Sequence, residues 1–446
     1  MKKMHTVDII AKKRDGMILS EKELTFLINA YTAGEIPDYQ MAAWLMAVYQ
    51  KGMTDEETAI LTLAMAKSGD MIDLTSIPGI KVDKHSTGGV ADTTTLVLAP
   101  LVAATGVPVA KMSGRGLGFT GGTIDKLESI PGLNATLTKE EFISNLLKHN
   151  LAITGQTADI APADGKIYAL RDVTATIESI PLIASSIMSK KIAAGADKIL
   201  LDVKVGNGAF MKKMADALKL AETMVRIGEL VGRQTIAAIT NMDEPLGEAV
   251  GNSLEVREAI GILSGRGSHS LKDVCVTLGS YMLVLAGAAC SPAVGKKLLR
   301  ELLDSGKGLN KFREFIKVQG GNDEIVANPL LLPQAGIKLT LVSKHKGFIN
   351  QINAAQVGFT AMRLGAGREY KEQQIDLAAG IIMHCRVGDY VEIDQPLATI
   401  YTNDGNKLEN AISMLRQSIV LGSDSVPIPP LIYGIVDING FHQEPV

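Results

Sequence analysis

Two stretches decide the fold of this chain, Ile80-Lys-Val-Asp-Lys-His-Ser-Thr-Gly-Gly89 and Val107-Pro-Val-Ala-Lys-Met-Ser-Gly-Arg-Gly-Leu-Gly-Phe-Thr-Gly-Gly-Thr123. Each opens with a short apolar run, passes into a loop of glycines and hydroxyl side chains, and leads into a helical segment. Further apolar runs of this kind stand at 151–154, 199–205 and 235–240. Strands that alternate with helices predict a parallel sheet with helices on both faces.

Outside this α/β region the sequence pattern changes. The residues up to Gly69 indicate helices, with capping boxes at Ser20/Glu23 and Thr54/Glu57. Successive helices are predicted over 254–315, and 337–400 is β-rich, with short strands that resemble a lipoyl-like sandwich. The predicted fold is therefore α/β: a small all-helical domain, a large α/β domain with a mixed or parallel sheet, and a β-rich C-terminal region.

The composition favours a protein that acts on small molecules. The chain has 446 residues, 46% of them hydrophobic and 21% charged, and a net charge of −3, so it offers no strong field for nucleic acid or membranes. Cys275, Cys290 and Cys385 are odd in number and far apart, which fits a reducing cytoplasm. No apolar run follows the N-terminal lysines, and no run is long enough to span a bilayer. We expect a cytoplasmic protein.

The loops after the first two strands predict an anion site, because ligands of open α/β sheets bind beyond the carboxyl ends of the strands. Glycines let backbone N–H groups approach an anion, hydroxyls donate to it, and a helix N-terminus adds partial positive charge. The loops at 84–89 and 111–123 combine these features with lysine and arginine side chains. Phosphate is the expected guest.

A third stretch sets Arg171, Ser186 and Lys190 within otherwise apolar, helical sequence, where a cation usually needs a partner or a function. Each signal also has a structural explanation. Gly-rich loops are common in α/β proteins, His85 alone fits a solvated loop, and the two cations fit solvent-facing helix positions. His384 and Cys385 lack a second pair at ligand spacing, which favours a structural role over metal binding.

Gly116-Leu-Gly-Phe-Thr-Gly121 also satisfies the dinucleotide pattern G-x-G-x-x-G. The acidic residue expected at the end of the next strand is missing, because Glu140 and Glu141 fall in a helix start after Thr138. The sequence contains neither a Walker A pattern nor a G-x-S-x-G elbow. A nicotinamide-dependent dehydrogenase therefore stays a weak alternative.

Ser113-Gly-Arg-Gly-Leu-Gly-Phe-Thr-Gly-Gly-Thr-Ile-Asp-Lys-Leu-Glu128 resembles the signature of the thymidine and pyrimidine-nucleoside phosphorylases, and Val82-Asp-Lys-His-Ser-Thr-Gly-Gly89 is a second block typical of them. Similar blocks run along nearly the whole chain, at 12–16, 155–157, 161–164, 202–206 and 251–258. The resemblance implies a homodimer. It also implies a helical domain of 1–69 and 164–191, an α/β phosphate-binding domain of 70–163 and 192–335, and a β-rich C-terminal part at 336–446.

The resemblance assigns roles residue by residue. For phosphate binding the matching positions are Lys84, His85, Ser86, Thr95, Lys111, Met112, Ser113 and Thr123. For the base they are Arg171, Ser186 and Lys190, and the catalytic set implied is His85, Arg171 and Lys190. Some members also hold a structural K⁺ ion, whose counterparts here are Ala91, Thr93, Leu246, Ala249 and Glu258.

Two positions depart from the family. Phe119 stands where relatives usually have histidine, which puts a polar contact from that loop in doubt. Ala91 stands where glycine is common, and an alanine there is strained if the backbone needs a positive φ. Lys111 resembles the broader, uridine-accepting enzymes, since thymidine-specific members tend to have an apolar residue at this position.

The implied reaction is reversible phosphorolysis of uridine, deoxyuridine and thymidine to a free pyrimidine and (deoxy)ribose 1-phosphate. We expect direct displacement with inversion, stabilisation of the leaving base by cations, and no cofactor requirement for the chemistry. The alternatives are a strict thymidine phosphorylase, a transferase like anthranilate phosphoribosyltransferase, the dehydrogenase above, and a non-catalytic relative with a decayed site. The last is disfavoured because Lys84, His85, Arg171, Ser186 and Lys190 are all present.

Overall fold

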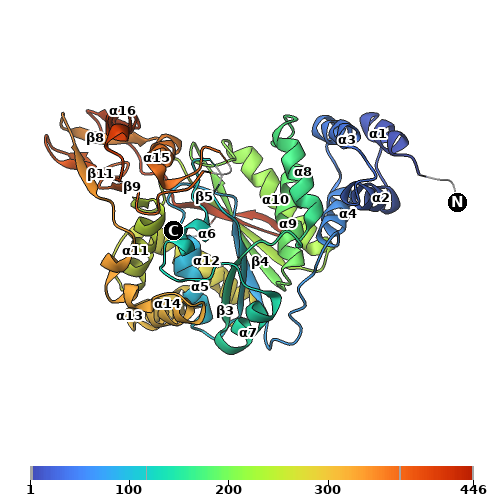
Figure 1. Cartoon of the computed structure of the whole chain (residues 1–446), viewed down its shortest axis with the longest axis horizontal. Helices are drawn as coiled ribbons and strands as arrows, with labels where there is room; N and C mark the ends of the chain where they lie inside the picture. Colours follow the sequence, from blue (N-terminus) through green and yellow to red (C-terminus); the bar gives the residue numbers. More distant parts are fainter. Residues whose placement is uncertain (1–3, 117, 371–372, 444–446) are drawn as a thin grey trace.

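The computed structural model describes residues 4–116, 118–370 and 373–443. A helical group at the N-terminal end, a central sheet covered by helices, and a C-terminal region of small sheets lie side by side along the long axis (Figure 1). The predicted fold class is confirmed. None of the helices within the described residues has the length and apolar character that crossing a bilayer requires.

The helical group contains four N-terminal helices and two that return later in the chain: α1 (Thr6–Arg14), α2 (Glu21–Thr32), α3 (Asp38–Lys51), α4 (Asp55–Ala66), α8 (Pro162–Asp172) and α9 (Ile180–Ala193). Both predicted capping boxes are present, at the starts of α2 and α4. Ala163, Ile167 and Leu182 join the apolar core of the N-terminal helices. That packing brings α8 and α9 against helices far away in the sequence.

The central sheet has seven strands in the order β14-β13-β5-β4-β1-β2-β3. Its bounds are β1 (Val82–Ser86), β2 (Val109–Ser113), β3 (Leu151–Gly155), β4 (Lys198–Val205), β5 (Thr235–Asn241), β13 (Ile432–Asp437) and β14 (Gly440–His442). The first five are parallel, as predicted, and each overlaps a predicted run. The antiparallel strands β13 and β14 were not predicted, and they make the sheet mixed.

The strand order reverses between β1 and β4, because the chain proceeds from β1 outward to β3 and then returns to build β4 and β5 on the other side. A crevice forms at such a reversal, beyond the carboxyl ends of the strands. The flanking helices are α5 (Thr94–Ala103), α6 (Thr123–Glu128), α7 (Lys139–His149), α10 (Met214–Leu230), α11 (Asn252–Leu263), α12 (His269–Leu285), α13 (Pro292–Asp304) and α14 (Lys307–Val318).

The C-terminal region consists of two small antiparallel sheets, β10-β8-β12 and β6-β9-β11-β7. Their bounds are β6 (Ala249–Val250), β7 (Ile337–Val342), β8 (Gly347–Ile352), β9 (Gly380–Met383), β10 (Tyr390–Val391), β11 (Pro396–Thr402) and β12 (Ile419–Gly422). Short helices accompany them: η1 (Asp323–Val326), η2 (Pro329–Leu331), α15 (Ala354–Ala361), η3 (Met362–Ala366), η4 (Gly405–Lys407) and α16 (Leu408–Gln417). Through β6 and β13 the region is tied to the large domain.

Candidate active site

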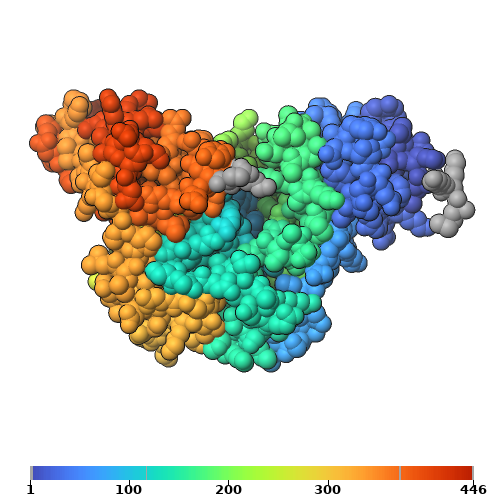
Figure 2. All heavy atoms as spheres, in the orientation of Figure 1, coloured from blue at the N-terminus to red at the C-terminus, as the bar shows by residue number. Residues whose placement is uncertain are grey.

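A cavity of about 510 Å³ lies beyond the carboxyl ends of β1 and β2, between the loops that follow these strands and helices α8 and α9. In the space-filling view the surface is hollowed between α8 and the segment that follows β2 (Figure 2). The cavity brings together most residues that the sequence singled out. Its lining includes His85, Ser86, Thr95, Lys111, Met112, Ser113, Thr123, Arg171, Ser186 and Lys190.

The first wall of the cavity is built from the end of β1 and the start of α5. Ser86 donates a hydrogen bond to Asp92 and accepts one from the backbone N–H of Gly88 at 3.2 Å. These bonds fold the loop back on itself, and Ser86, Thr87 and Gly88 line the cavity. Thr95 sits in the first turn of α5, where the helix dipole favours an anion.

Lys84 precedes the loop but lies beneath the cavity floor rather than in its lining, with a side chain 1% exposed. Its Nζ lies 2.9 Å from Asp202 Oδ2, and the same oxygen lies 2.9 Å from Lys204 Nζ. Burial lowers the pKa of Lys84, but Asp202 and Asp92 outweigh it, and the net shift is upward. Lys84 is therefore a buried cation that acts on the cavity from below.

The end of β2 continues this first wall. Lys111 is 3% exposed, and its Nζ donates to the Lys84 carbonyl at 2.5 Å and lies 3.8 Å from Asp83 Oδ1. Burial, together with Lys191 nearby, lowers the pKa of Lys111 to about 7. This ammonium group is thus held at the point of losing its proton near neutral pH.

His85 is partly buried among lysines. Desolvation and the charges of Lys191, Lys111 and Lys190 lower its pKa well below the usual value. A neutral imidazole follows, with one ring nitrogen that donates and one that accepts. His85 can therefore give a hydrogen bond to a ligand without adding another charge to a site already rich in cations.

The opposite wall comes from α8 and α9. Arg171 is 2% exposed, and its guanidinium donates to the carbonyls of Thr176, Ile177 and Leu182 at 3.2, 2.5 and 3.1 Å. A guanidinium has five N–H donors, so two remain for a ligand in the cavity. The backbone contacts fix the plane of the group before any ligand arrives.

Lys190 and Ser186 form a second pair of donors on this wall. Lys190 Nζ lies 2.6 Å from Asp164 Oδ2 and donates to Ser186 Oγ at 3.0 Å. Residues four apart lie on the same face of a helix, so α9 presents both groups together. Asp164 on α8 holds the ammonium group in place, and it was not among the predicted site residues.

The shape of the Gly-rich loop after β2 requires glycine at two of its positions. A Cβ on Gly122 would lie 2.0 Å from the backbone nitrogen of Gly116, and a Cβ on Gly116 would lie 2.7 Å from the Thr120 carbonyl oxygen. The loop therefore crosses itself where no side chain fits. Close backbone approach accounts for Gly116 of the G-x-G-x-x-G pattern and for Gly122 just after it, and Gly118 has φ 60°, a conformation that favours glycine.

The five residues matched to a K⁺ site lie apart from this cavity, where the loop after β1 meets the loop before α11. Leu246 N–H donates to the Val90 carbonyl and Gly247 N–H to the Ala91 carbonyl, both at 3.2 Å. Ala91 has φ 55°, so the left-handed conformation that strains an alanine is present. Burial raises the pKa of Glu258 to about 8, although two backbone N–H groups donate to its carboxylate.

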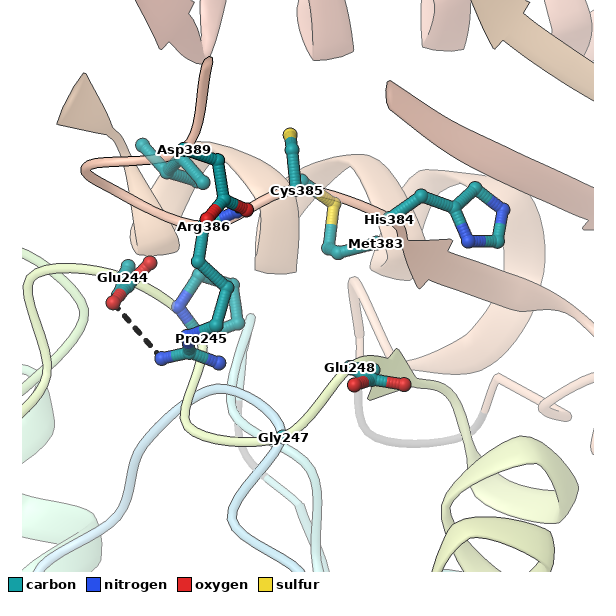
Figure 3. Close-up of a pocket in the computed structure, with 10 residues that line it drawn as sticks. Glu244, Pro245, Gly247, Glu248, Met383, His384, Cys385, Arg386 and Asp389 are labelled. Atoms are coloured by element: carbon teal, nitrogen blue, oxygen red, sulfur yellow. Dashed lines mark hydrogen bonds and ion pairs between the residues drawn. The ribbon is translucent and has the colours of Figure 1, made fainter. Parts of the chain in front are cut away.

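A second cavity, of about 380 Å³, lies between the loop after β5 and the loop after β9. Figure 3 shows Arg386 extending toward Glu244 while the ring of His384 points away from both. Its polar groups are already engaged: Arg386 also donates to the Leu246 carbonyl at 3.2 Å, and Asp389 accepts from the Arg386 N–H at 2.8 Å. We interpret this second cavity as a structural gap where the large domain meets the C-terminal region.

Sequence patterns missed the buried carboxylates that pair with the lysines of the site. Asp83 on β1 pairs with Lys191 of α9 at 2.8 Å, and Asp202 on β4 pairs with Lys84 and Lys204. A charged residue inside an apolar strand run is a usable signal, because such residues are rarely buried without a partner. Tyr168 and Phe210 also line the cavity and carried no sequence signal of their own.

Comparison with known proteins gives consistent results. Residues 7–69 match the model of a glycosyl transferase family, helical bundle domain, residues 79–309 match the a/b domain of that family, and residues 348–422 match a pyrimidine nucleoside phosphorylase C-terminal domain. The pyrimidine-nucleoside phosphorylase of Geobacillus stearothermophilus is 54% identical over 96% of this chain and 99% of its own. That of Bacillus subtilis strain 168 is 54% identical over 97% of this chain and 100% of its own.

Among solved structures, anthranilate phosphoribosyltransferase from Thermus thermophilus superimposes with a TM-score of 0.59 at 21% identity. The match covers 70% of this chain and 99% of that chain. At this identity the likeness concerns the fold alone.

The lowered pKa of Lys111 predicts a pH dependence of oxyanion binding. Below about pH 7 the ammonium is charged, and above it one proton must be taken up with the anion, so affinity should fall with rising pH, by roughly tenfold per unit at most. Calorimetry with sulfate, a dianion throughout this range, measures the effect. Lys111→Met should abolish the slope, and Lys190→Met should keep it. A flat profile in the unsubstituted protein would contradict the assignment.

Proposed function

The chain belongs to the pyrimidine-nucleoside phosphorylase family and is a pentosyltransferase, and from this membership we propose that it cleaves uridine, deoxyuridine and thymidine with inorganic phosphate. The observation that carries the proposal is one cavity with two unlike walls. One wall offers glycine N–H groups, hydroxyls and Lys111, which suit a phosphate. The other offers the fixed donors of Arg171, Ser186 and Lys190, which suit the carbonyl oxygens and ring nitrogen of a pyrimidine.

In the proposed reaction a phosphate oxygen attacks the anomeric carbon on the face opposite the base. The bond to the base nitrogen breaks as the new carbon–oxygen bond forms, and the product is an inverted sugar 1-phosphate. Holding both reactants in one cavity makes a bimolecular step effectively unimolecular. The chemistry asks for no covalent enzyme intermediate.

Negative charge grows on the leaving pyrimidine, and donors aimed at developing charge lower the barrier. The two free N–H donors of Arg171 and the ammonium of Lys190, held by Asp164, are the proposed stabilisers. His85 adds a neutral hydrogen bond, consistent with its lowered pKa. Ser186 orients the ring from the same face of α9.

Lys111 supports the broad specificity that we propose. Its Nζ sits at the end of β2, on the proposed phosphate wall, and donates to the Lys84 carbonyl. An ammonium at this place can donate to a ribose hydroxyl or to phosphate, which an apolar side chain cannot. The strict thymidine enzyme is the alternative that the assay below tests.

Removing Arg171 or Lys190 should lower turnover by roughly 10²–10³, as the loss of an oxyanion donor does. We expect Arg171→Ala and Lys190→Ala to show this loss and Lys219→Ala, an exposed change on α10, to leave turnover unchanged. The measurement is phosphate-dependent release of free base from uridine, deoxyuridine and thymidine in chelator. Near-normal turnover in Lys190→Ala overturns its role, and release from thymidine alone overturns the broad specificity.

We further propose that a K⁺ ion binds between the loop after β1 and the segment that leads into α11, with Ala91, Thr93, Leu246, Ala249 and Glu258 as its ligands. The described part of the chain holds no group of three or more His, Cys, Asp and Glu suited to a metal. A monovalent cation instead suits carbonyl and hydroxyl oxygens with one carboxylate, which is the donor set here. The Leu246 carbonyl also accepts from Arg386, so the ion would share that oxygen. Its role would be to tie the loop after β1 to α11.

Potassium chloride should then raise the melting temperature above that in tetramethylammonium chloride of equal ionic strength. A ligand at ~100 times its Kd stabilises by about 2.7 kcal/mol, which corresponds to a shift of several degrees. Differential scanning calorimetry measures the shift. Glu258→Gln should remove most of it, and an equal shift in that variant would argue against the site.

We also propose that the chain forms a homodimer through its helical group. Large apolar side chains are exposed there, including Val7 at 60%, Ile18 at 63%, Tyr39 at 73% and Val173 at 78%. Tyr39 and Met46 lie seven residues apart, so they share one face of α3. These exposed apolar side chains lie on the helical group, and we propose that a second copy of the chain covers them.

Tyr39→Glu combined with Met46→Glu should convert the dimer to a monomer, because two carboxylates would be buried without partners. Sedimentation velocity measures the mass of the particle. The matched control is Leu330→Glu, which replaces an apolar side chain 70% exposed on η2 and should leave the mass unchanged. A monomeric unsubstituted protein, or a double variant that stays dimeric, contradicts the proposal.

A further inference from the structure

The C-terminal region touches the Gly-rich loop at 114–123. Arg368 follows η3, and its Nη1 donates to Asp125 Oδ1 at 2.9 Å. A Cβ on Gly367 would lie 3.2 Å from the Gly118 carbonyl oxygen, so this segment lies directly on the loop. Figure 2 shows the C-terminal region against the segment that follows β2.

Asp125 links this contact to the cavity lining. Its side chain is 4% exposed, and its Oδ2 accepts a hydrogen bond from the Gly116 N–H at 2.6 Å. Its Oδ1 also accepts from Arg115 Nη1 at 3.2 Å. Both Gly116 and Arg115 line the cavity. The Asp125 carboxylate therefore binds the backbone of the Gly-rich loop through one oxygen and Arg368 through the other.

An aromatic contact holds the neighbouring residues of the loop. The rings of Phe119 and Phe359 on α15 are 4.7 Å apart, and a Cβ on Gly358 would lie 2.7 Å from the Phe119 carbonyl oxygen. Phe119 therefore packs against the C-terminal region instead of making a polar contact. Asn252 fixes the base of the Arg368 segment, because its Nδ2 donates to the Ala366 carbonyl at 2.9 Å.

We propose that Arg368 is a positioning residue for phosphate, acting through Asp125 on the loop at 114–123. The guanidinium has two effects. It neutralises a carboxylate that would otherwise repel an anion nearby, and it orients that carboxylate toward the Gly116 N–H. The C-terminal region then contributes to phosphate binding, because it supplies the residue that positions the loop. The inference rests on the proposed function only in taking phosphate as the ligand.

The test is calorimetric binding of inorganic phosphate, and separately of uracil, to the full-length protein. Arg368→Met should weaken phosphate roughly tenfold, as loss of a charge-assisted hydrogen bond does, and leave uracil affinity unchanged. Arg368→Lys, which keeps the charge, should recover part of the loss. The matched control is Arg363→Met on η3, whose guanidinium is exposed and contacts Met414 instead of the loop.

The decisive test introduces Arg368→Met into a protein that already carries Asp125→Asn. If Arg368 acts through the carboxylate, Arg368→Met should have little further effect on phosphate affinity once Asp125 is an asparagine. Equal phosphate binding by Arg368→Met and Arg363→Met, or equal weakening of phosphate and uracil by Arg368→Met, overturns the positioning role. Failure of the unsubstituted protein to bind phosphate overturns the proposed function and the inference with it.

Discussion

The structure depends on buried positive charge held in place by buried carboxylates. The proposed ligand is a phosphate dianion, which calls for cations, yet an ammonium removed from water is costly unless a carboxylate lies beside it. Asp202 sits between Lys84 and Lys204, and Asp83 between Lys191 and Lys111. Each of these two aspartates serves two lysines, and Asp92 lies 3.9 Å from Lys84, so four lysines face three carboxylates. The surplus charge is directed at the cavity, where an anion can complete the balance.

The fold makes this arrangement possible because the charges come from adjacent parallel strands. Asp83 and Lys84 lie on β1, Lys111 on β2, and Asp202 on β4. The register places Lys84 opposite Leu200 and Ser86 opposite Asp202, so the groups meet near the carboxyl ends. Helices α8 and α9 then close the site from the other side with donors on rigid helices. The wall proposed for phosphate and the wall proposed for the base thus belong to different parts of the chain.

Much of the fold could be predicted because its signals are local. Apolar runs ending in glycines gave the five parallel strands, and the capping boxes gave the starts of α2 and α4. The strand β13 was missed, because its place beside β5 depends on contacts with residues far away in the chain. The sequence also did not show how deeply Lys84 is buried. Its loop pattern predicts a phosphate-binding residue, but only the packing shows that its side chain lies beneath the floor of the cavity.

The contact between the Gly-rich loop and the C-terminal region shows the same limit. The glycines at 116 and 122 exist because the loop crosses itself, and a loop with so few side chains cannot hold its own shape. Contacts with the rest of the chain must therefore fix the shape of the loop. Asp125 and Phe119 make these contacts. The roles of Asp125 and Phe119 therefore depend on Arg368 and Phe359, which are far away in the sequence, and the local sequence pattern does not show them.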